Sequence, residues 1–224
     1  MSFADKKLSE IAVSVPGSTS LLRKYDLDFC CGGSDTLANA AAEKGLNLAE
    51  IETRLTELQN SKAENPEEYW VNATYPEIID HILVRYHQRH REQLQELIVL
   101  ADRVESVHGD RDDCPIGVAA ELRNVYDDLS NHMMKEEHVL FPMIKAGNYM
   151  MAQMPIRMME MEHAEHGEHL DVLKSLTNNM TPPADACNTW RALYSGIQEF
   201  ADDLMMHIHR ENNILFPRVI AENH

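Results

Sequence analysis

Two stretches of the chain share one polar pattern inside otherwise apolar helical segments. HMMKEEHVLFP at residues 132–142 and HIHRENNILFP at residues 207–217 both read His, three residues, Glu, three residues, Leu-Phe-Pro. Residues four apart lie on the same face of a helix, together with the apolar residues at the same spacing. A chain with this pattern must therefore pack helices around imidazole and carboxylate groups.

A second pair of motifs shows that the pattern belongs to an internal repeat. HQRHREQL begins at His87 and HAEHGEHL begins at His163, 76 residues later, while His132 and His207 are 75 residues apart. Repetition at a fixed spacing indicates two equivalent halves. We therefore expect two helices in each half, with His87 and His163 at matching positions.

Apolar residues recur at helical spacing from Tyr75 onward, and no segment alternates as a strand would. The breaks HGDRDDCPIG, AGNYMMAQMP and NNMTPP separate four expected helices. The sequence thus predicts an all-α fold, an up-down-up-down four-helix bundle. The expected helices are 75–107, 115–146, 154–178 and 184–221.

The residues before the bundle indicate a small helical domain at 1–58 and a linker at 59–74, followed by the bundle domain at 75–224. Ser34 is a candidate cap for a helix that Gly45 ends, and Asn47 with Glu50 forms a capping-box pattern. A unit of this size holds little core of its own.

Charge and hydropathy exclude several classes of function. The chain has 20 basic and 37 acidic residues, a net charge of −17, which argues against nucleic acid and anionic membrane surfaces as partners. No run of 18 apolar residues is present, so no transmembrane helix is expected. The first residues, MSFADKKLSE, lack the apolar segment of a signal peptide. We expect a cytoplasmic protein, either a monomer or a homodimer.

The repeated polar residues coincide with the core stripes of their helices. Ionised carboxylates in an apolar core are costly unless they are paired or bind metal, and no Lys or Arg lies on these stripes at the same height. Nitrogen and oxygen donors without thiolate suit iron or manganese, with zinc as an alternative. The predicted metal ligands are His87, His132, Glu136, His163, His207 and Glu211.

The remaining histidines have weaker patterns. His90 and His166 also lie on core stripes, and they could be extra ligands, partners of ligands or acid/base groups of a pocket; we favour the pocket role. Six histidines lie off the stripes or in a loop or tail, and we expect them to be solvated: His81, His108, His138, His169, His209 and His224.

These motifs resemble the hemerythrin-like family of di-iron helical bundles. YHQRH, HMMKEEHVLFP, MEMEHAEHGEHL and HIHRENNILFP carry the resemblance. It implies a hemerythrin-like bundle in which single histidines join two His-x-x-x-Glu pairs around two iron ions per chain, bridged by carboxylates and by oxo or hydroxo groups. The ligands implied are the same six residues.

The segment SVPGSTSLLRKYDLDFCCGGSDTLANAA resembles the small domain of the iron-sulfur cluster repair di-iron proteins, the RIC group of YtfE or ScdA type. The resemblance covers nearly the whole chain. It implies repair of iron-sulfur clusters damaged by oxidative and nitrosative stress, by iron donation, by handling of NO, or by both. Damaged iron-sulfur proteins are the implied clients, and O₂ and NO are the implied small ligands.

Cys30 and Cys31 stand before two glycines and an expected helix. Thiols close to a helix N-terminus can have a lowered pKa and react as thiolates. Adjacent cysteines do not readily form an ordinary disulfide. We therefore expect a reactive or iron-handling pair; two inert thiols are the alternative.

Three other functions remain open on the sequence. The chain could be a reversible O₂ or NO sensor or carrier, an enzyme that reduces NO or peroxide, or a metal-free bundle with polar core groups. The Cys30-Cys31 pair and the small domain weigh against a simple carrier. A metal-free bundle would leave the repeat unexplained and would require neutral glutamates at 136 and 211.

Overall fold

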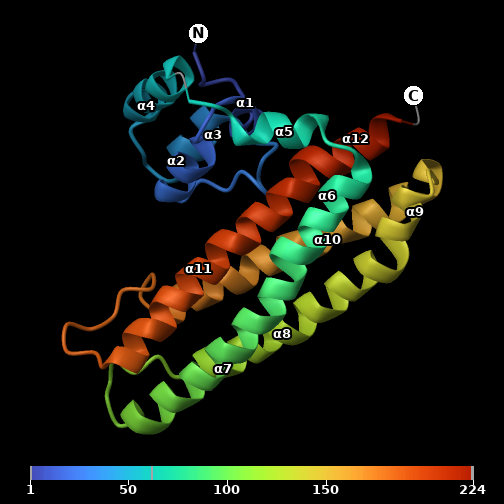
Figure 1. Ribbon diagram of the computed structural model, residues 1–224. Helices are drawn as coiled ribbons and strands as arrows, with labels where there is room; N and C mark the ends of the chain where they lie inside the picture. Colours follow the sequence, from blue (N-terminus) through green and yellow to red (C-terminus); the bar gives the residue numbers. More distant parts are fainter. Residues whose placement is uncertain (1, 62, 223–224) are drawn as a thin grey trace. The chain divides into compact units, whose positions relative to one another are not determined.

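The computed structural model describes residues 2–61 and 63–222, and these residues form helices without a β-strand (Figure 1). The prediction of an all-α fold, a four-helix bundle preceded by a small helical region, is confirmed. The elements are α1 (Leu8–Ser14), α2 (Ser18–Lys24), α3 (Leu37–Glu43), α4 (Leu48–Asn60), α5 (Pro66–Asn72), α6 (Tyr75–Ile82), η1 (Leu83–His87), α7 (Gln88–His108), α8 (Val118–Lys135), η2 (Glu136–Leu140), α9 (Phe141–Lys145), α10 (Tyr149–Leu176), α11 (Asn188–Arg210), η3 (Glu211–Leu215) and α12 (Phe216–Ala221).

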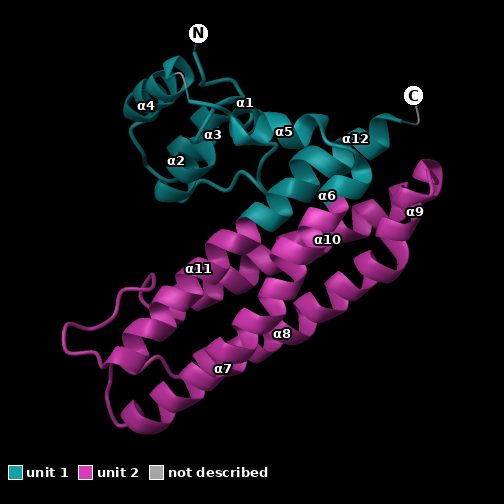
Figure 2. Cartoon of the chain, viewed as in Figure 1, with its two compact units in different colours: residues 1–78, 206–224 teal, residues 79–205 magenta. Residues whose placement is uncertain are grey.

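The chain divides into two compact units, drawn in two colours in Figure 2. The first unit comprises Met1–Ile78 and Met206–His224, and the second comprises Ile79–Met205. Helices α6 and α11 each contribute residues to both units. The C-terminal end of the last long helix thus belongs to the same unit as the N-terminal helices.

The second unit is the four-helix bundle. Helix α8 packs against α7 and α10, and α10 also packs against α9. On α11, Gly196 lies so close to α7 that a Cβ would come within 2.6 Å of Leu97 Cδ2. The core stripes of the four helices are buried as expected, for example at Leu94, Leu129 and Ile197.

Three of the four long helices begin or end a few residues away from their expected limits. The second helix begins at Val118 because Gly117, with φ 102°, is its N-cap. The third begins at Tyr149 rather than 154, directly after Gly147 (φ 75°) ends the preceding helix, and it continues through Pro155. A proline inside a helix removes one backbone hydrogen bond, here the one that residue 155 would otherwise donate to the carbonyl oxygen of Met151.

The first unit has a core of its own. Leu8, Ile11, Leu22, Phe29 and Leu37 are fully buried there. Helix α1 packs against α2, α5 and η3, and α4 packs against α2 and α3. The hydrogen-bonding of the chain start and of the Cys30-Cys31 loop is therefore set within this unit.

Two local features of the first unit differ from the sequence expectations. Thr36, not Ser34, caps the third short helix, which begins at Leu37. Residues 66–72 form α5 although the sequence indicates a linker there, because Asn65 accepts a hydrogen bond from Glu67 N and Pro66 occupies the first turn. The capping interaction between Asn47 and Glu50 N is present as expected.

Three π-helical segments interrupt the long helices at the repeated motifs. His87 is the last residue of η1, Glu136 is the first of η2 and Glu211 is the first of η3. Such single π turns occur often at functional sites. The Leu-Phe-Pro of each repeat follows directly, with Phe141 and Phe216 buried where the α-helix resumes.

His169 links α10 to α8 through two carboxylates. Its Nδ1 lies 2.6 Å from Glu121 Oε1, and its Nε2 lies 3.0 Å from Asp128 Oδ2. Burial lowers the pKa of His169, but the hydrogen bonds to the two carboxylates outweigh burial, so the pKa is raised above its ordinary value. The sequence analysis expected this side chain to be solvated.

The link predicts a pH-dependent contribution to stability. A raised folded-state pKa gives stabilisation that is complete below the unfolded pKa of about 6.5 and is lost as pH rises through the folded pKa. His169→Gln should therefore lower the free energy of unfolding by up to about 1 kcal/mol at pH 5.5 and by less at pH 9. Urea unfolding at both pH values measures this, with exposed His138→Gln as the control; a loss independent of pH would contradict it.

Candidate metal centre

All six predicted ligands are buried, and each comes from a long helix or from its π turn. His87 and Glu136 belong to η1 and η2, His132 to α8 and His163 to α10, so four of the six lie in the second unit. His207 and Glu211 come from α11 and η3, in the first unit. The helix-face assignments made from spacing are therefore consistent with the burial of these side chains.

Glu136 has the surroundings of a metal ligand. Its Oε2 lies 3.3 Å from His87 Nε2 and 3.4 Å from His132 Nε2. Neither carboxylate oxygen forms a hydrogen bond with any described residue, although the side chain is fully buried. Donor atoms about 2.1 Å from a common ion lie roughly 3.0–3.5 Å from one another. The spacing around Glu136 is therefore the spacing of metal ligands.

A third imidazole nitrogen lies beside this carboxylate. His163 Nε2 lies 3.1 Å from His132 Nε2, deep in the core. The Nδ1 atoms of His87 and His132 already contact other carboxylates, at 2.8 Å from Glu137 Oε1 and at 2.9 Å from Glu162 Oε2. An imidazole that donates from Nδ1 presents a lone pair at Nε2. The lone pairs are thus directed into a space where a cation would stabilise them.

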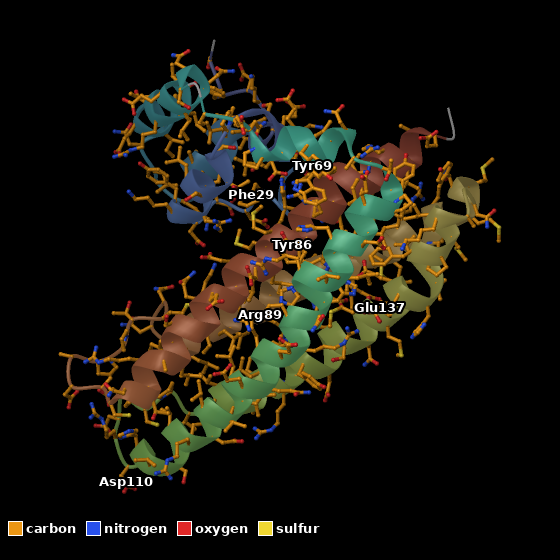
Figure 3. All side chains as sticks on the ribbon, in the orientation of Figure 1. Phe29, Tyr69, Tyr86, Arg89, Asp110 and Glu137 are labelled. Carbon is orange, nitrogen blue, oxygen red and sulfur yellow. The ribbon has the colours of Figure 1, made fainter. Side chains whose placement is uncertain are left out.

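Glu137 and Glu162 were not identified in the sequence analysis. Glu137, labelled in Figure 3, also accepts a hydrogen bond from Arg91 at 2.7 Å, and Glu162 accepts one from Lys135. The hydrogen bond from the imidazole, aided by that from the cation, lowers the pKa of each carboxyl to about 2, against the opposing effect of burial. Both are therefore ionised at neutral pH and can hold the imidazole N–H.

Replacing Glu137 by glutamine should weaken metal binding by roughly 10–100-fold without abolishing it. The amide can still contact Nδ1 but no longer provides a negative charge that favours the required tautomer. The rate of iron loss to a chelator measures the effect. Glu92→Gln on α7, an exposed carboxylate with no contact to a predicted ligand, is the matched control. An unchanged rate in Glu137→Gln would contradict this positioning role.

In the first unit, His207 and Glu211 repeat the relation of His132 to Glu136. His207 Nε2 lies 3.3 Å from Glu211 Oε1, and both side chains are fully buried. The ligand atoms of the six residues fall into two groups that share Glu136 and Glu211, each with its atoms within 4.8 Å of one another. The groups are His87 with His207, and His132 with His163, each with both glutamates. Such sets of imidazole nitrogen and carboxylate oxygen donors fit metal binding.

His90 and His166 are buried but belong to neither group. The His90 ring packs edge-on to Phe200, at 5.4 Å between centroids, and near Tyr86. The His166 ring packs edge-on to that of His132, at 4.9 Å. Their surroundings are aromatic, which fits a role in lining the site better than a role as ligands.

The expectation that His209 is solvated is wrong. Its side chain is fully buried, packs edge-on to Phe29 at 5.4 Å between centroids, and lies 2.8 Å from Asn213 Nδ2. The expectation used only the core stripe of the four-helix bundle. Near its end, α11 also packs within the first unit, and this second surface buries His209. His138 is exposed as expected, and His224 lies outside the described residues.

Asp28 organises the loop that contains the two adjacent cysteines. Its carboxylate accepts hydrogen bonds from the backbone N–H groups of Cys30, Cys31 and Gly32, at 3.0, 2.9 and 2.8 Å. The two sulfur atoms are 3.8 Å apart. Asp28, Cys30 and Cys31 together form a third group whose donor atoms lie close enough to hold a metal ion.

The lowered thiol pKa expected from a nearby helix start is wrong for Cys30. The hydrogen bond with Cys31, burial, and the negative charges of Cys31 and Asp28 raise the pKa of Cys30 well above its ordinary value. The following helix begins only at Leu37, too far away to stabilise a thiolate. Cys30 is buried, whereas Cys31 is partly exposed.

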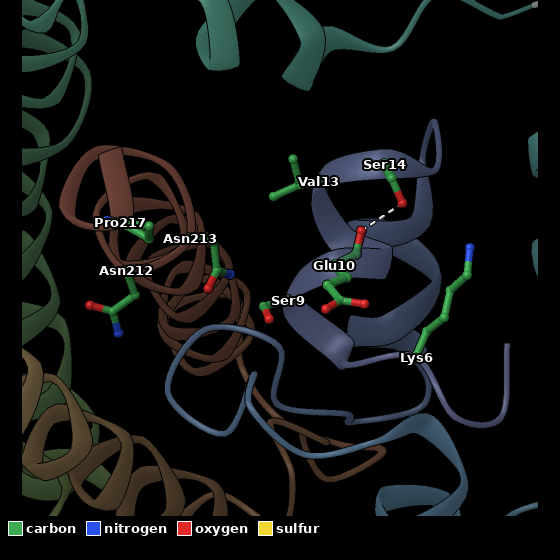
Figure 4. Close-up of a pocket in the computed structure, with 8 residues that line it drawn as sticks. All are labelled: Lys6, Ser9, Glu10, Val13, Ser14, Asn212, Asn213 and Pro217. Carbon is green, nitrogen blue, oxygen red and sulfur yellow. Dashed lines mark hydrogen bonds between the residues drawn. The ribbon is translucent and has the colours of Figure 1, made fainter. Parts of the chain in front are cut away.

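The same loop contacts the segment that follows Glu211. Asn212 Nδ2 donates to the carbonyl oxygen of Cys30 at 3.0 Å, and Asn213 Nδ2 donates to that of Phe29 at 2.8 Å. Both asparagines line a groove of about 510 Å³ together with residues of α1 such as Ser9 and Val13, which Figure 4 labels. Within the first unit, the cysteine loop is thus fixed to the residue next to a predicted ligand.

Comparison with known proteins supports this description of the site. Residues 78–219 match the family model of the hemerythrin HHE cation binding domain. A probable iron-sulfur cluster repair protein of Haemophilus influenzae is 68% identical over 99% of this chain and 100% of its own length. The chain belongs to the iron-sulfur cluster repair proteins, within the hemerythrin HHE cation-binding family.

Other iron-sulfur cluster repair proteins are similar over the same extent. The YtfE proteins of Musicola paradisiaca and of Escherichia coli O81 are each 54% identical to this chain. The similarity covers 98% of both chains in the first comparison and 99% of both chains in the second. Residues 4–59 match a second family model, ScdA_N, a domain of unknown function. No described helix is both long and apolar enough to span a membrane.

Gly33, the second glycine after the two cysteines of this repair protein, lies where the backbone leaves no room for a side chain. A Cβ on Gly33 would lie 2.4 Å from the carbonyl oxygen of Phe29, whereas a Cβ on Gly32 would meet nothing closer than 3.2 Å. Gly33→Ala should therefore lower the free energy of unfolding by about 1–3 kcal/mol, and Gly32→Ala by clearly less. Urea unfolding compares the two variants, and equal losses would contradict the prediction.

Proposed function

We propose that this protein binds two iron ions between its four long helices and uses them to repair iron-sulfur clusters damaged by oxidative and nitrosative stress. His87, His132, Glu136, His163, His207 and Glu211 are the proposed ligands, with both glutamates and an oxo or hydroxo group as bridges. Bound iron supplies the metal that a damaged cluster has lost and open positions for small ligands such as O₂ or NO.

The observation that carries the proposal is the buried carboxylate of Glu136 among imidazole nitrogens. It lies at ligand spacing from two of them and has no hydrogen bond of its own among the described residues. Two ions of charge +2 would offset the charges of Glu136 and Glu211 and leave a net positive centre. The donor set has no thiolate, which favours iron over a structural zinc site.

The relatives support the choice of process. Their names describe iron-sulfur cluster repair, and the similarity covers both matched family regions of this chain. Damaged iron-sulfur proteins are therefore the proposed clients. Because a client must reach the iron, we propose that the iron leaves through the protein rather than remaining as a permanent redox centre.

Cys30 and Cys31 are proposed to handle iron in transit. Asp28 accepts hydrogen bonds from the backbone of both cysteines, and the three side chains form a group that could hold a metal ion. Asn212, next to Glu211 in the sequence, donates a hydrogen bond to the Cys30 carbonyl oxygen. The raised pKa of Cys30 means that the entering metal must displace a proton from this thiol. Cys31, partly exposed, is proposed as the first contact.

The first test measures metal content per chain by elemental analysis on protein purified without oxygen. Native protein should contain two iron ions, and the double variant Glu136→Ala, Glu211→Ala far fewer. Glu160→Ala, Glu165→Ala removes the same charge from an exposed face of α10 and should keep both ions. Iron that is absent from the native protein, or unaffected by the ligand variant, would overturn the metal site.

The second test measures recovery of a [4Fe–4S] protein inactivated by NO. Iron-loaded native protein should restore activity, and the ligand double variant should not. Cys30→Ala, Cys31→Ala should retain both iron ions but restore activity slowly. Unchanged iron content with unchanged repair in the cysteine variant would contradict the transit role, while leaving the di-iron site intact.

A further inference from the structure

Helix α10 carries an exposed face of methionine that the proposed function does not use. Thirteen methionines occur in the chain, and five lie between residues 150 and 161 with 51–73% of their surface exposed. Successive helical residues are rotated by about 100°, which places all five within an arc of about 100°. The methionine face consists of Met150, Met151, Met154, Met158 and Met161.

Neighbouring methionines show that this exposure is specific to the face. Met159, on the same helix, is 3% exposed, and Met133 on α8 is 1% exposed next to the half-exposed Met134. Single exposed apolar side chains are common on proteins, but five on one arc of one helix are not explained by chance exposure. The buried methionines Met133 and Met159 thus lie outside this face.

Thioethers differ from other apolar side chains in their chemistry. The sulfur lone pair attacks a peroxide oxygen, the O–O bond breaks, and the sulfur becomes a sulfoxide while the peroxide is reduced to water. Sulfur loses two electrons and the peroxide gains them. Hydrogen peroxide is uncharged, so the net charge of −17 does not repel it from this surface.

We propose that the methionine face is a site of reversible sulfoxidation, which consumes up to five peroxide molecules per chain before the core is affected. A sulfoxide on this face is solvated, so the fold loses little. A sulfoxide at Met133 or Met159 would place a polar group in the core, where burial without a hydrogen bond is costly. Methionine sulfoxide reductases, which take two electrons from thiols, reverse the step.

The test treats the full-length protein with hydrogen peroxide and measures sulfoxide at each methionine by peptide mass spectrometry. The five face residues should react at least about tenfold faster than Met133 and Met159, because reactivity follows exposure. The order of the oxidation rates of the methionines should be the same with and without iron. Similar rates for face and core would overturn the proposal, as would a preference that appears only when iron is bound.

A second variant tests whether the face protects the fold. The variant Met150→Leu, Met151→Leu, Met154→Leu, Met158→Leu, Met161→Leu keeps an equally good helix former at each position without an oxidisable sulfur. The variant should consume five fewer equivalents of peroxide, and its Met133 and Met159 should be oxidised at a lower dose than in the native protein. Native protein with a fully oxidised face should keep its helix content and iron, and reductase treatment should restore its mass. Loss of helix or iron at that dose would overturn the proposal.

Discussion

Replacing Arg210 with alanine is expected to lower the free energy of unfolding by about 3–5 kcal/mol. Arg210 and Glu67 are both buried and form a two-point ion pair, with Nη2 at 3.3 Å from Glu67 Oε1 and Nη1 hydrogen-bonded to Oε2. The guanidinium also lies 4.8 Å from the Trp70 ring centre. Without it, a buried carboxylate loses its charge partner, and urea unfolding should show the loss.

A surface pair provides the control. Arg85 binds Asp203 at 2.6 Å but is nearly half exposed, so Arg85→Ala should cost less than about 1 kcal/mol. The double variant Arg210→Met, Glu67→Gln should recover part of the stability lost by Arg210→Ala, because it leaves no unpaired charge. Equal losses in the buried and surface variants would show that burial does not govern this pair.

The second large effect is expected for Glu136→Gln, which should change the free energy of unfolding in opposite directions without and with metal. At pH 8 in the absence of metal, Glu136→Gln should raise the free energy of unfolding by about 1–4 kcal/mol, because it removes a buried carboxylate that has no hydrogen bond among the described residues. With iron present, the same variant should be less stable than the native protein, because a ligand is lost and binding stabilises only the folded state.

Urea unfolding with a chelator and with anaerobic Fe²⁺ measures both signs. Glu160→Gln, at an exposed position of α10, should change little under either condition. A stability loss in Glu136→Gln under both conditions would mean that the glutamate is a structural group of the core. A gain only without metal would identify a residue kept for binding at the cost of apo stability.

The sequence was sufficient to predict the six buried donors. Two His-x-x-x-Glu pairs and two matching histidines fell on apolar stripes, and spacing alone places such residues on one helix face. The all-α fold class was predicted from the same helical periodicity. The N-cap of α3 was missed because Ser34 and Thr36 are both good caps, and only the turn geometry decides between them.

The partners of the ligands could not be predicted in the same way. Glu137 and Glu162 are polar residues beside a stripe, and their role depends on how far neighbouring helices are rotated toward His87 and His132. The burial of His209 was missed because a helix face that is polar in one bundle can be covered by another part of the chain. Periodicity describes one packing surface at a time.

The π turns have a consequence for how this sequence can change. Segments η2 and η3 each hold about one residue more per turn than an α-helix, begin at a ligand glutamate and are followed by a buried phenylalanine. Because a π turn accommodates one additional residue, deleting one residue from η2 or η3 would restore α-helical winding and leave Phe141 or Phe216 on the same face of its helix. The same deletion in the α-helical part on either side would rotate all following residues by about 100° and take the phenylalanine out of the core. The turn beside each ligand glutamate is thus the one part of its helix where we expect the chain to lose a residue without repacking of the core.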